Sequence, residues 1–325
     1  MNVLLLSIGA KKTLVEAFKS SPSVSRVITT DCSPYAAGLY ASDSHYIVPL
    51  MHSPEYIPTL VNLCKKENVS VLVPLNEEEL FVIAENRKIF ESLNILINLS
   101  SLDVISLCKD KLEFYKVLSD AGIPCVPTIK ASDFKPESPV FFYPLMAKPQ
   151  KGAASMGNIV ISSTDDIKKI PENMMGNYIL QPFIDGIEYG VDLYTDFLSG
   201  EIIQIFIKEK ISMRNGETEK SRSVKNDEIV SLVKKTVEIL KPKGVSDLDI
   251  LYEDGTYYLL EMNPRFGGGY SHAFLSGMDY PAFLANNATG IANTPCIGEY
   301  EAGTVALKYT SSVLLNEDSL LRDLH

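Results

Sequence analysis

The chain lacks an excess of basic residues, although its charged fraction of 22% is ordinary. Its 325 residues include 30 Lys and Arg against 41 Asp and Glu, which gives a net charge of −11. Non-specific binding to nucleic acid requires a basic surface, so this charge balance argues against a nucleic-acid partner. It does not exclude a local basic pocket that holds a nucleotide.

Paired cysteines and long apolar runs are also missing. The five cysteines include no C-x-x-C pair, and their number is odd. We therefore expect neither a disulfide framework nor a zinc site, and a reducing cytoplasm is the simplest location. No apolar run approaches the roughly 20 residues that cross a bilayer, so we expect no membrane partner. The apolar residues 3–8 follow no basic region, which argues against a signal peptide.

The first 100 residues contain an alternation of apolar strands and amphipathic helices. The predicted strands are residues 3–8, 26–30, 46–48, 69–74 and 95–97, and the predicted helices are residues 13–20, 53–68 and 77–93. This order is typical of an α/β domain with a parallel, doubly wound sheet. The first strand ends in Ser-Ile-Gly-Ala-Lys, so the G-x-G-x-x-G fingerprint of NAD-binding folds is absent.

The pattern changes near residue 100 from alternating strands and helices to hairpins. The predicted strands are residues 145–148, 158–162, 178–183, 188–197, 202–209, 246–252, 256–262 and 304–315, and the predicted helices are residues 110–121, 227–240 and 282–289. Strands that follow one another through short turns indicate antiparallel sheets. The remainder of the chain is therefore expected to be α+β.

One predicted strand carries polar residues at every second position. Glu261, Asn263 and Arg265 share one face, because strand side chains alternate, while Leu260 and Met262 point to the other face. Three polar groups at the end of an otherwise apolar strand indicate a site that faces a cleft.

The turn before this strand decides whether Asp249 joins the polar face. A two-residue turn at Asp254 and Gly255 would pair Asp249 with Leu260, whereas a three-residue loop that includes Glu253 would place Asp249 and Glu261 on one face. In the second case two carboxylates and the Asn263 amide form an oxygen site suited to Mg²⁺. Arg265 could then stabilise charge on a transferred phosphoryl group.

The segment Leu-Glu-Met-Asn-Pro-Arg-Phe-Gly-Gly-Gly at residues 260–269 resembles the metal-binding signature of ATP-grasp ligases, particularly the carbamoyl-phosphate-synthetase-like branch. The resemblance implies a Rossmann-like pre-ATP-grasp domain at residues 1–100. It further implies a two-lobed α+β ATP-grasp domain at residues 101–310. Its lobes span about 101–180 and 181–310, and a tail follows at 311–325. In this family ATP lies between the two lobes.

The resemblance assigns two lysines and a serine to the ATP phosphates. Lys148 ends a predicted strand and precedes the glycine-containing loop of residues 149–157. Its ammonium and the N–H groups of such a loop are suited to phosphate oxygens. Lys111, near the start of the helix at 110–121, and Ser155, in the loop, are further expected phosphate contacts.

Residues 178–188, Tyr-Ile-Leu-Gln-Pro-Phe-Ile-Asp-Gly-Ile-Glu, resemble the hinge that receives adenine in the family. The hinge backbone is expected at the base edge, and the glutamate that ends the segment at the ribose hydroxyls. The glutamine stands where many members have an acidic residue. The expected ATP contacts in this segment are Gln181, Pro182, Phe183, Ile184 and Glu188.

A basic stretch at residues 207–220 resembles the segment beside the triphosphate. Lys208 is the predicted γ-phosphate contact, with Arg214 and Lys220 as further candidates, although a solvated hairpin is nearly as good an interpretation. Together with Arg265, Lys208 forms the predicted catalytic pair.

The resemblance implies a ligase that uses ATP and Mg²⁺, or Mn²⁺. It would activate a carboxylate as an acyl phosphate, which an amine or a similar nucleophile then attacks. A carbamoyl-phosphate-type reaction on bicarbonate and a non-catalytic ATP-binding module are the alternatives. The expected partners are small-molecule carboxylates and amines, and a homodimer is consistent with the family.

Overall fold

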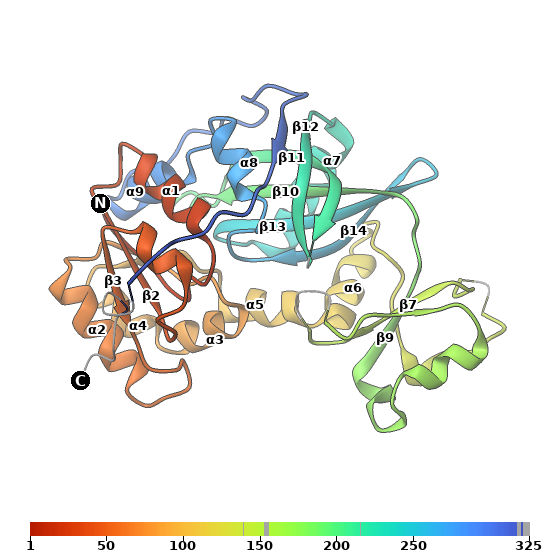
Figure 1. Ribbon diagram of the computed structural model, residues 1–325. Coiled ribbons are helices and arrows are strands. Elements are labelled where there is room, and N and C mark those ends of the chain that lie inside the picture. Colours follow the sequence, from red (N-terminus) through yellow and green to blue (C-terminus); the bar gives the residue numbers. More distant parts are fainter. Residues whose placement is uncertain (139, 153–155, 215, 317–319, 321–325) are drawn as a thin grey trace.

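The computed structural model describes residues 1–138, 140–152, 156–214, 216–316 and 320. In this part of the chain the strands form a five-stranded, a six-stranded and a four-stranded sheet. Figure 1 shows the first at the left, the second in the centre and the third at the right. The predicted fold class is confirmed: a parallel sheet comes first and antiparallel sheets follow. The domain boundaries near residues 100, 180 and 310 stay predictions.

The N-terminal sheet has the strand order β3-β2-β1-β4-β5. Its strands are β1 (Asn2–Leu5), β2 (Arg26–Asp31), β3 (Ser44–Ile47), β4 (Val71–Val73) and β5 (Leu96–Ile97). All neighbours are parallel. The order reverses at β1, and ligands of such sheets bind beside the carboxyl ends of the strands at that point.

Nine α-helices occur in the described residues. They are α1 (Lys12–Ser20), α2 (Tyr56–Lys66), α3 (Glu77–Glu85), α4 (Arg87–Glu91), α5 (Leu102–Lys109), α6 (Lys111–Asp120), α7 (Asp227–Leu240), α8 (Tyr270–Leu275) and α9 (Tyr280–Ala288). The single helix predicted at 77–93 is wrong, because the chain leaves helical geometry at Asn86. The Asn86 side chain donates to the Val82 carbonyl at 2.9 Å, which competes with a continuous helix.

The two antiparallel sheets follow in chain order. The four-stranded sheet contains β6 (Ile129–Lys130), β7 (Leu145–Pro149), β8 (Ile159–Ile161) and β9 (Tyr178–Pro182). The six-stranded sheet contains β10 (Ile187–Thr195), β11 (Ile202–Arg214), β12 (Glu217–Val224), β13 (Gly244–Glu253), β14 (Thr256–Asn263) and β15 (Val305–Leu307). The strand predicted at 304–315 is therefore wrong beyond Leu307. The apolar side chains there have no layer to cover, since Leu314 is 97% exposed.

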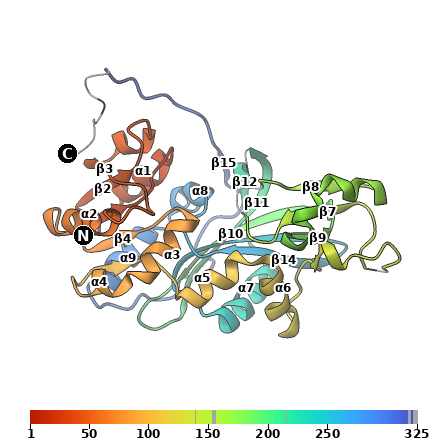
Figure 2. The ribbon, with the colours of Figure 1, turned by 90° about the horizontal axis from the view of Figure 1, so that it is seen from below.

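The six-stranded sheet is covered on both faces. Figure 2 shows α5, α6 and α7 along one face, where Leu232, Val233 and Leu248 are among the core residues. On the other face, aromatic residues after β14 pack against the N-terminal sheet and its first helix. Phe266 meets Phe18 edge to face, with ring centroids 5.6 Å apart. Burial of such rings contributes roughly 1.5–3 kcal/mol each, which holds the end of β14 against α1.

Candidate active site

A cavity of about 940 Å³ is lined by residues of the two antiparallel sheets and of the segments that follow β1 and β4. Ligand cavities in proteins measure roughly 300–1,000 Å³, so this one has room for a nucleotide and a second molecule. Its polar lining includes Lys148 and Gln181 from the four-stranded sheet, Asp249 and Glu261 from the six-stranded sheet, and Lys11 from the turn between β1 and α1.

The β13–β14 hairpin turns at Asp254 and Gly255, whose φ angles are +47° and +84°. Glu253 pairs with Thr256, so this is the two-residue turn and not the three-residue loop. The register shifts beyond Ile250, and Asp249 pairs directly with Glu261. A β-bulge therefore restores the shared face that the turn alone would have abolished.

The bulge also changes the direction of Leu260. The predicted alternation sends this side chain away from the polar face, but Leu260 lines the cavity. Residue Met262 keeps its predicted direction and is buried in the core. Leu260 thus adds an apolar wall beside the carboxylates.

Acidic and amide oxygens gather where the first half of β13 pairs with the end of β14. Asp247 pairs with Asn263 across the strands, next to the Asp249–Glu261 pair, and all four residues line the cavity. Burial and the neighbouring Asp249 carboxylate raise the pKa of Asp247 above its ordinary value. Crowded carboxylates of this kind favour a cation, and their hard oxygen atoms fit Mg²⁺. The roles of Asp249, Glu261 and Asn263 as metal ligands remain predictions.

Lys148 and Lys111 line the cavity on the side of the four-stranded sheet. Burial lowers the pKa of Lys148, although the Glu261 carboxylate opposes this effect. Within the described ranges no ion pair or side-chain hydrogen bond holds its ammonium. The Lys111 ammonium donates to the Gly152 carbonyl at 2.9 Å. Ser155, the third predicted phosphate contact, lies outside the described residues.

The predicted adenine hinge also lines the cavity, at Gln181, Pro182, Phe183 and Ile184. The Gln181 side chain is buried and donates to Thr128 Oγ1 at 2.9 Å, but its Oε1 has no partner in the part of the chain that is described. A buried acceptor without a donor is costly, and the exocyclic amine of adenine could satisfy it. The sequence departure at Gln181 therefore still fits an adenine site.

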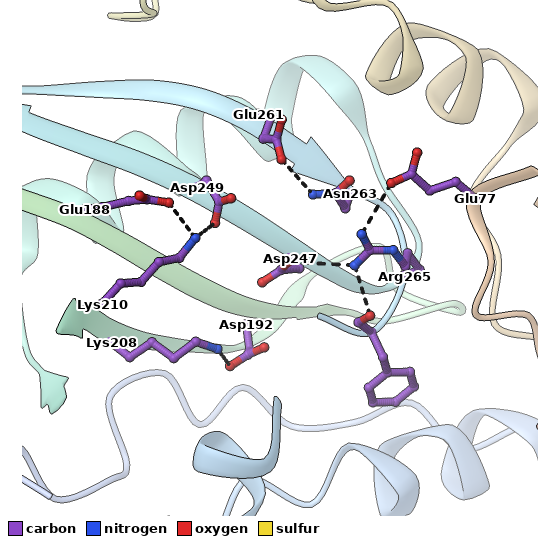
Figure 3. Close-up of polar contacts among 11 residues, drawn as sticks. Glu77, Glu188, Asp192, Lys208, Lys210, Asp247, Asp249, Glu261, Asn263 and Arg265 are labelled. Atoms are coloured by element: carbon purple, nitrogen blue, oxygen red, sulfur yellow. Dashed lines mark hydrogen bonds and ion pairs between the residues drawn. The ribbon is translucent and has the colours of Figure 1, made fainter. Parts of the chain in front are cut away.

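The lysine nearest the acidic residues is Lys210 rather than the predicted Lys208. Lys208 is 1% exposed, forms an ion pair with Asp192 and does not line the cavity. Lys210 lies two residues further along the same face of β11. Its ammonium is 2.7 Å from Glu188 and 2.6 Å from Asp249. Figure 3 shows Lys210 pointing between these two carboxylates.

Gly190 on β10 explains how both lysines cross that strand. A Cβ at this position would lie 3.0 Å from Lys208 Cε and 3.2 Å from Lys210 Cε. Burial alone would lower the pKa of Lys210, but the Asp249 and Glu188 carboxylates outweigh it and raise the pKa. This ammonium therefore stays charged between the predicted ribose and metal sites. Arg214 and Lys220, the other candidates of this stretch, are exposed and lie outside the cavity.

Arg265 is held at the junction between the N-terminal sheet and the six-stranded sheet. Its guanidinium is 3.4 Å from Glu77 and 3.8 Å from Asp247 (Figure 3). Glu77 begins α3, just after β4, and also pairs with Lys109 at 2.7 Å. Arg265 thus lines the cavity between the metal-ligand candidates and the N-terminal sheet.

The three glycines after Arg265 allow close approach of neighbouring side chains. A Cβ on Gly267 would lie 2.4 Å from Asp247 Cγ, one on Gly268 would lie 2.9 Å from Glu217 Cδ, and one on Gly269 would lie 2.7 Å from Lys208 Cε. Real Cβ atoms do not approach so closely. Glycine is therefore required at positions 267 and 269, because the Asp247 and Lys208 side chains are held in ion pairs with little exposure, whereas the exposed Glu217 side chain has room to move away from a Cβ on residue 268.

Sequence reasoning missed several cavity residues, namely Lys11, Asn76, Glu77, Lys109, Lys210, Glu217 and Asp247. Asp247 precedes Asp249 by two positions, so strand periodicity was a usable signal. No local signal marks Lys11, Asn76 and Glu77 as cavity residues, because their position depends on how the N-terminal sheet packs against the end of β14.

His272, beside the glycine run, is a buried structural residue in this fold. Its ring makes hydrogen bonds with Ser221 Oγ at 2.8 Å and Thr304 Oγ1 at 3.1 Å. Burial and the nearby Lys208 ammonium lower its pKa to about 4. The imidazole is therefore expected to be neutral in the folded protein at neutral pH.

Stability is expected to fall as the pH drops from about 6.5 towards 4, because the unfolded chain takes up a proton at His272 before the folded chain does. Replacing His272 with glutamine should remove on the order of 2–3 kcal/mol of this pH dependence. The measurement is urea unfolding of both proteins between pH 4 and 7. His52→Gln, at an exposed position, is the matched control. Parallel stability curves for the wild type and His272→Gln would contradict the assignment.

Two family models match most of the chain. A model described as "ATP-grasp domain" matches residues 108–269, and one described as "PylC-like, N-terminal domain" matches residues 3–98. The first matched range ends just after β5, the last strand of the parallel sheet, and the second begins near the end of α5.

Individual relatives are distant. The Vancomycin B-type resistance protein VanB of Enterococcus faecalis is 28% identical over 207 residues, which are 57% of this chain and 58% of that protein. The arginine-specific large chain of carbamoyl phosphate synthase of Geobacillus stearothermophilus is 23% identical over 176 residues, 50% of this chain and 17% of that protein. The chain thus covers less than two thirds of either relative.

Solved structures support the fold over nearly the whole chain. Biotin carboxylase from Campylobacter jejuni, crystallised with a β-γ-ATP compound, superposes with a TM-score of 0.72 and 18% identity over 93% of this chain and 74% of that one. No helix among the described residues has the length and apolar character to cross a membrane.

Proposed function

We propose, from the ATP-grasp domain that the chain contains at residues 108–269, that the protein is an ATP- and Mg²⁺-dependent carboxylate–amine ligase. It activates a carboxylate as an acyl phosphate and joins it to an amine or a similar nucleophile, with release of ADP and phosphate. The supporting observation is that Asp249, Glu261 and Asn263 face the same cavity as Lys111 and Lys148. Distant segments of the sequence thus meet with the charges that a metal–triphosphate complex requires.

Each wall of the cavity has a distinct task in this proposal. The hinge and the apolar side chains of Met146, Leu251 and Leu260 receive the adenine, and Glu188 receives the ribose. Lys111 and Lys148 neutralise the charge of the phosphates. Mg²⁺, when bound, would neutralise further charge and orient the terminal phosphate.

In this proposal the reacting carboxylate binds beside Arg265. Its contacts with Glu77 and Asp247 hold the guanidinium in place, so it is ready to stabilise charge on the phosphoryl group that is transferred. The carboxylate oxygen forms a bond to the γ-phosphorus as the bond to ADP breaks. The amine nitrogen then attacks the acyl carbon, phosphate leaves and the amine gives up its proton. No nucleophile from the protein is required.

Lys210 is the phosphate or ribose contact that replaces Lys208 in this proposal. Before nucleotide binds, its ammonium occupies the space between Glu188 and Asp249. This position lets Lys210 compensate the acidic residues when they have no cation, and contact the nucleotide when one arrives. Use of Mn²⁺ in place of Mg²⁺, a homodimer and a cytoplasmic location belong to the same proposal.

The function is tested by a screen of carboxylic acids against amines, beginning with amino acids and dipeptides. Release of ADP and phosphate is measured with Mg·ATP. We expect at least one pair to give turnover that requires both partners. Turnover with bicarbonate and ammonia alone would identify the carbamoyl-phosphate-type reaction instead. Tight ATP binding without turnover across the whole panel would reject a ligase in favour of a nucleotide-binding module.

A further inference from the structure

Lys11 is a charged residue of the cavity that the proposed chemistry leaves unused. It follows β1 and precedes α1, at the point where the strand order of the N-terminal sheet reverses. Its backbone N–H donates to the Ile8 carbonyl at 3.0 Å, which fixes the turn. The side chain extends into the cavity lining, together with Asn76 and Glu77 from the turn after the adjacent strand β4.

No acidic group among the described residues forms an ion pair with the Lys11 ammonium. Burial lowers the pKa of Lys11, while the Glu217 carboxylate opposes this effect and Arg265 adds to it. A partly buried ammonium without a direct partner is costly to the folded protein. Lys148, the predicted phosphate contact, shows the same combination of burial and missing partner. Lys11 is thus a second lysine that lines the cavity, is partly buried and has no ion-pair partner among the described residues; it lies in the turn after β1.

The carboxylate with the largest electrostatic influence on Lys11 belongs to Glu217. Glu217 begins β12, lines the cavity and lies over Gly268, where a side chain would collide with it. It pairs with Lys308 at 3.1 Å but not with Lys11. A cation from the turn after β1 and a carboxylate from the six-stranded sheet therefore line one cavity without forming an ion pair with each other.

Arg265 borders the same space, so it joins the Lys11 region to the predicted metal site. Its guanidinium is already engaged by Glu77 and Asp247, whereas the Lys11 ammonium is not. A substrate held between Lys11 and Glu217 would consequently lie beside the place where the acyl phosphate forms. That is the position the attacking amine must take.

We infer that Lys11 and Glu217 form a subsite for an amine that carries an anionic group. The Lys11 ammonium binds the anion, and the Glu217 carboxylate receives the amino group. This inference rests on the proposed function and specifies its second substrate. A carboxylate or a phosphate ester would supply the same charge, so α-amino acids and phosphorylated amines are both candidates.

The test measures binding rather than turnover. Thermal unfolding is followed with Mg²⁺ and AMP-PNP present, and each probe is added in turn: the twenty common amino acids, their amides, O-phosphoethanolamine and ethanolamine. We expect at least one anionic amine to raise the Tm by about 2 °C or more, while its neutral counterpart has no effect. A response to amino acids identifies the carboxylate class, and a response to O-phosphoethanolamine identifies the phosphate class.

Variants connect the response to Lys11. Lys11→Met should abolish the shift and Lys11→Arg should retain it, because arginine keeps the charge. Lys12→Met is the matched control: Lys12 is the next residue, pairs with Glu16 at 3.5 Å and does not line the cavity. The unfolding midpoint without probes shows whether each variant folds.

The inference is overturned if no anionic amine stabilises the protein, if amides act as well as acids, or if Lys11→Met responds like the wild type. Because the nucleotide analogue is not hydrolysed, these outcomes do not depend on turnover. A failure of the ligase screen would therefore reject the proposed function without being confused with a failure of this subsite.

Discussion

Replacement of Glu261 by glutamine is expected to lower the rate of ADP release by about 10³-fold or more. The side chain keeps its size and remains paired with Asp249 across the hairpin, so the fold should be unchanged. What is lost is a negative charge beside Asp249 and Asn263, at the centre of the predicted metal site. The measurement is ADP release with the acid and amine found in the screen, over a range of Mg²⁺ concentrations.

The matched control is Asp254→Asn, at the tip of the same hairpin. This residue is exposed, lies outside the cavity and has φ +47°, a conformation that asparagine tolerates well. It removes one negative charge from the hairpin without altering the site. If Glu261→Gln retained near wild-type turnover while the control was also active, the metal assignment at Glu261 would have to be abandoned.

Replacement of Lys148 by methionine should change stability and activity in opposite directions. The ammonium is partly buried without a partner in the described residues, and burial lowers its pKa. A methionine of similar length avoids this desolvation, so the protein without nucleotide should gain roughly 1 kcal/mol in its free energy of unfolding. The same change removes a charge from the predicted phosphate site, and kcat/KM for ATP should fall by about 10²–10³-fold.

Urea unfolding without nucleotide and the kinetics of ADP release measure the two effects. Lys168→Met provides the control, since that lysine is 82% exposed and forms an ion pair with Asp165, outside the cavity. A purely structural role for Lys148 predicts the reverse pattern, in which stability falls and the dependence on ATP concentration is unaltered. Such a result would remove Lys148 from the nucleotide site.

The polar face of β14 illustrates what local sequence can predict. Glu261 and Asn263 share a face because strand side chains alternate, and this holds wherever the strand is placed. Local sequence could not show whether Asp249 lies on the same face as Glu261, because this depends on the length of the turn and on the presence of a β-bulge. Leu259, next to the bulge, makes hydrogen bonds with the backbone of Pro124 and Val126 at 2.9 and 3.2 Å. A contact with a segment so distant in sequence cannot be derived from the hairpin alone.

The choice between Lys208 and Lys210 was likewise decided outside their own strand. Both residues occupy one face of β11, and their periodicity is identical. Lys208 forms an ion pair with Asp192 on β10. Lys210 forms ion pairs with Glu188 and Asp249. Strand pairing fixes these distances, and pairing is a property of the assembled sheet.

The sequence by itself determined the alternation of strands and helices, the polar face of β14, and the lysines and hinge that match the ATP-grasp pattern. These features are local, because they depend on residue type and spacing within one element. Only the tertiary structure decided which carboxylates meet, that Lys210 rather than Lys208 contacts them, and that Lys11 lines the same cavity from the turn after β1. Such contacts arise when separate sheets pack against one another, and no spacing along the chain encodes their distances.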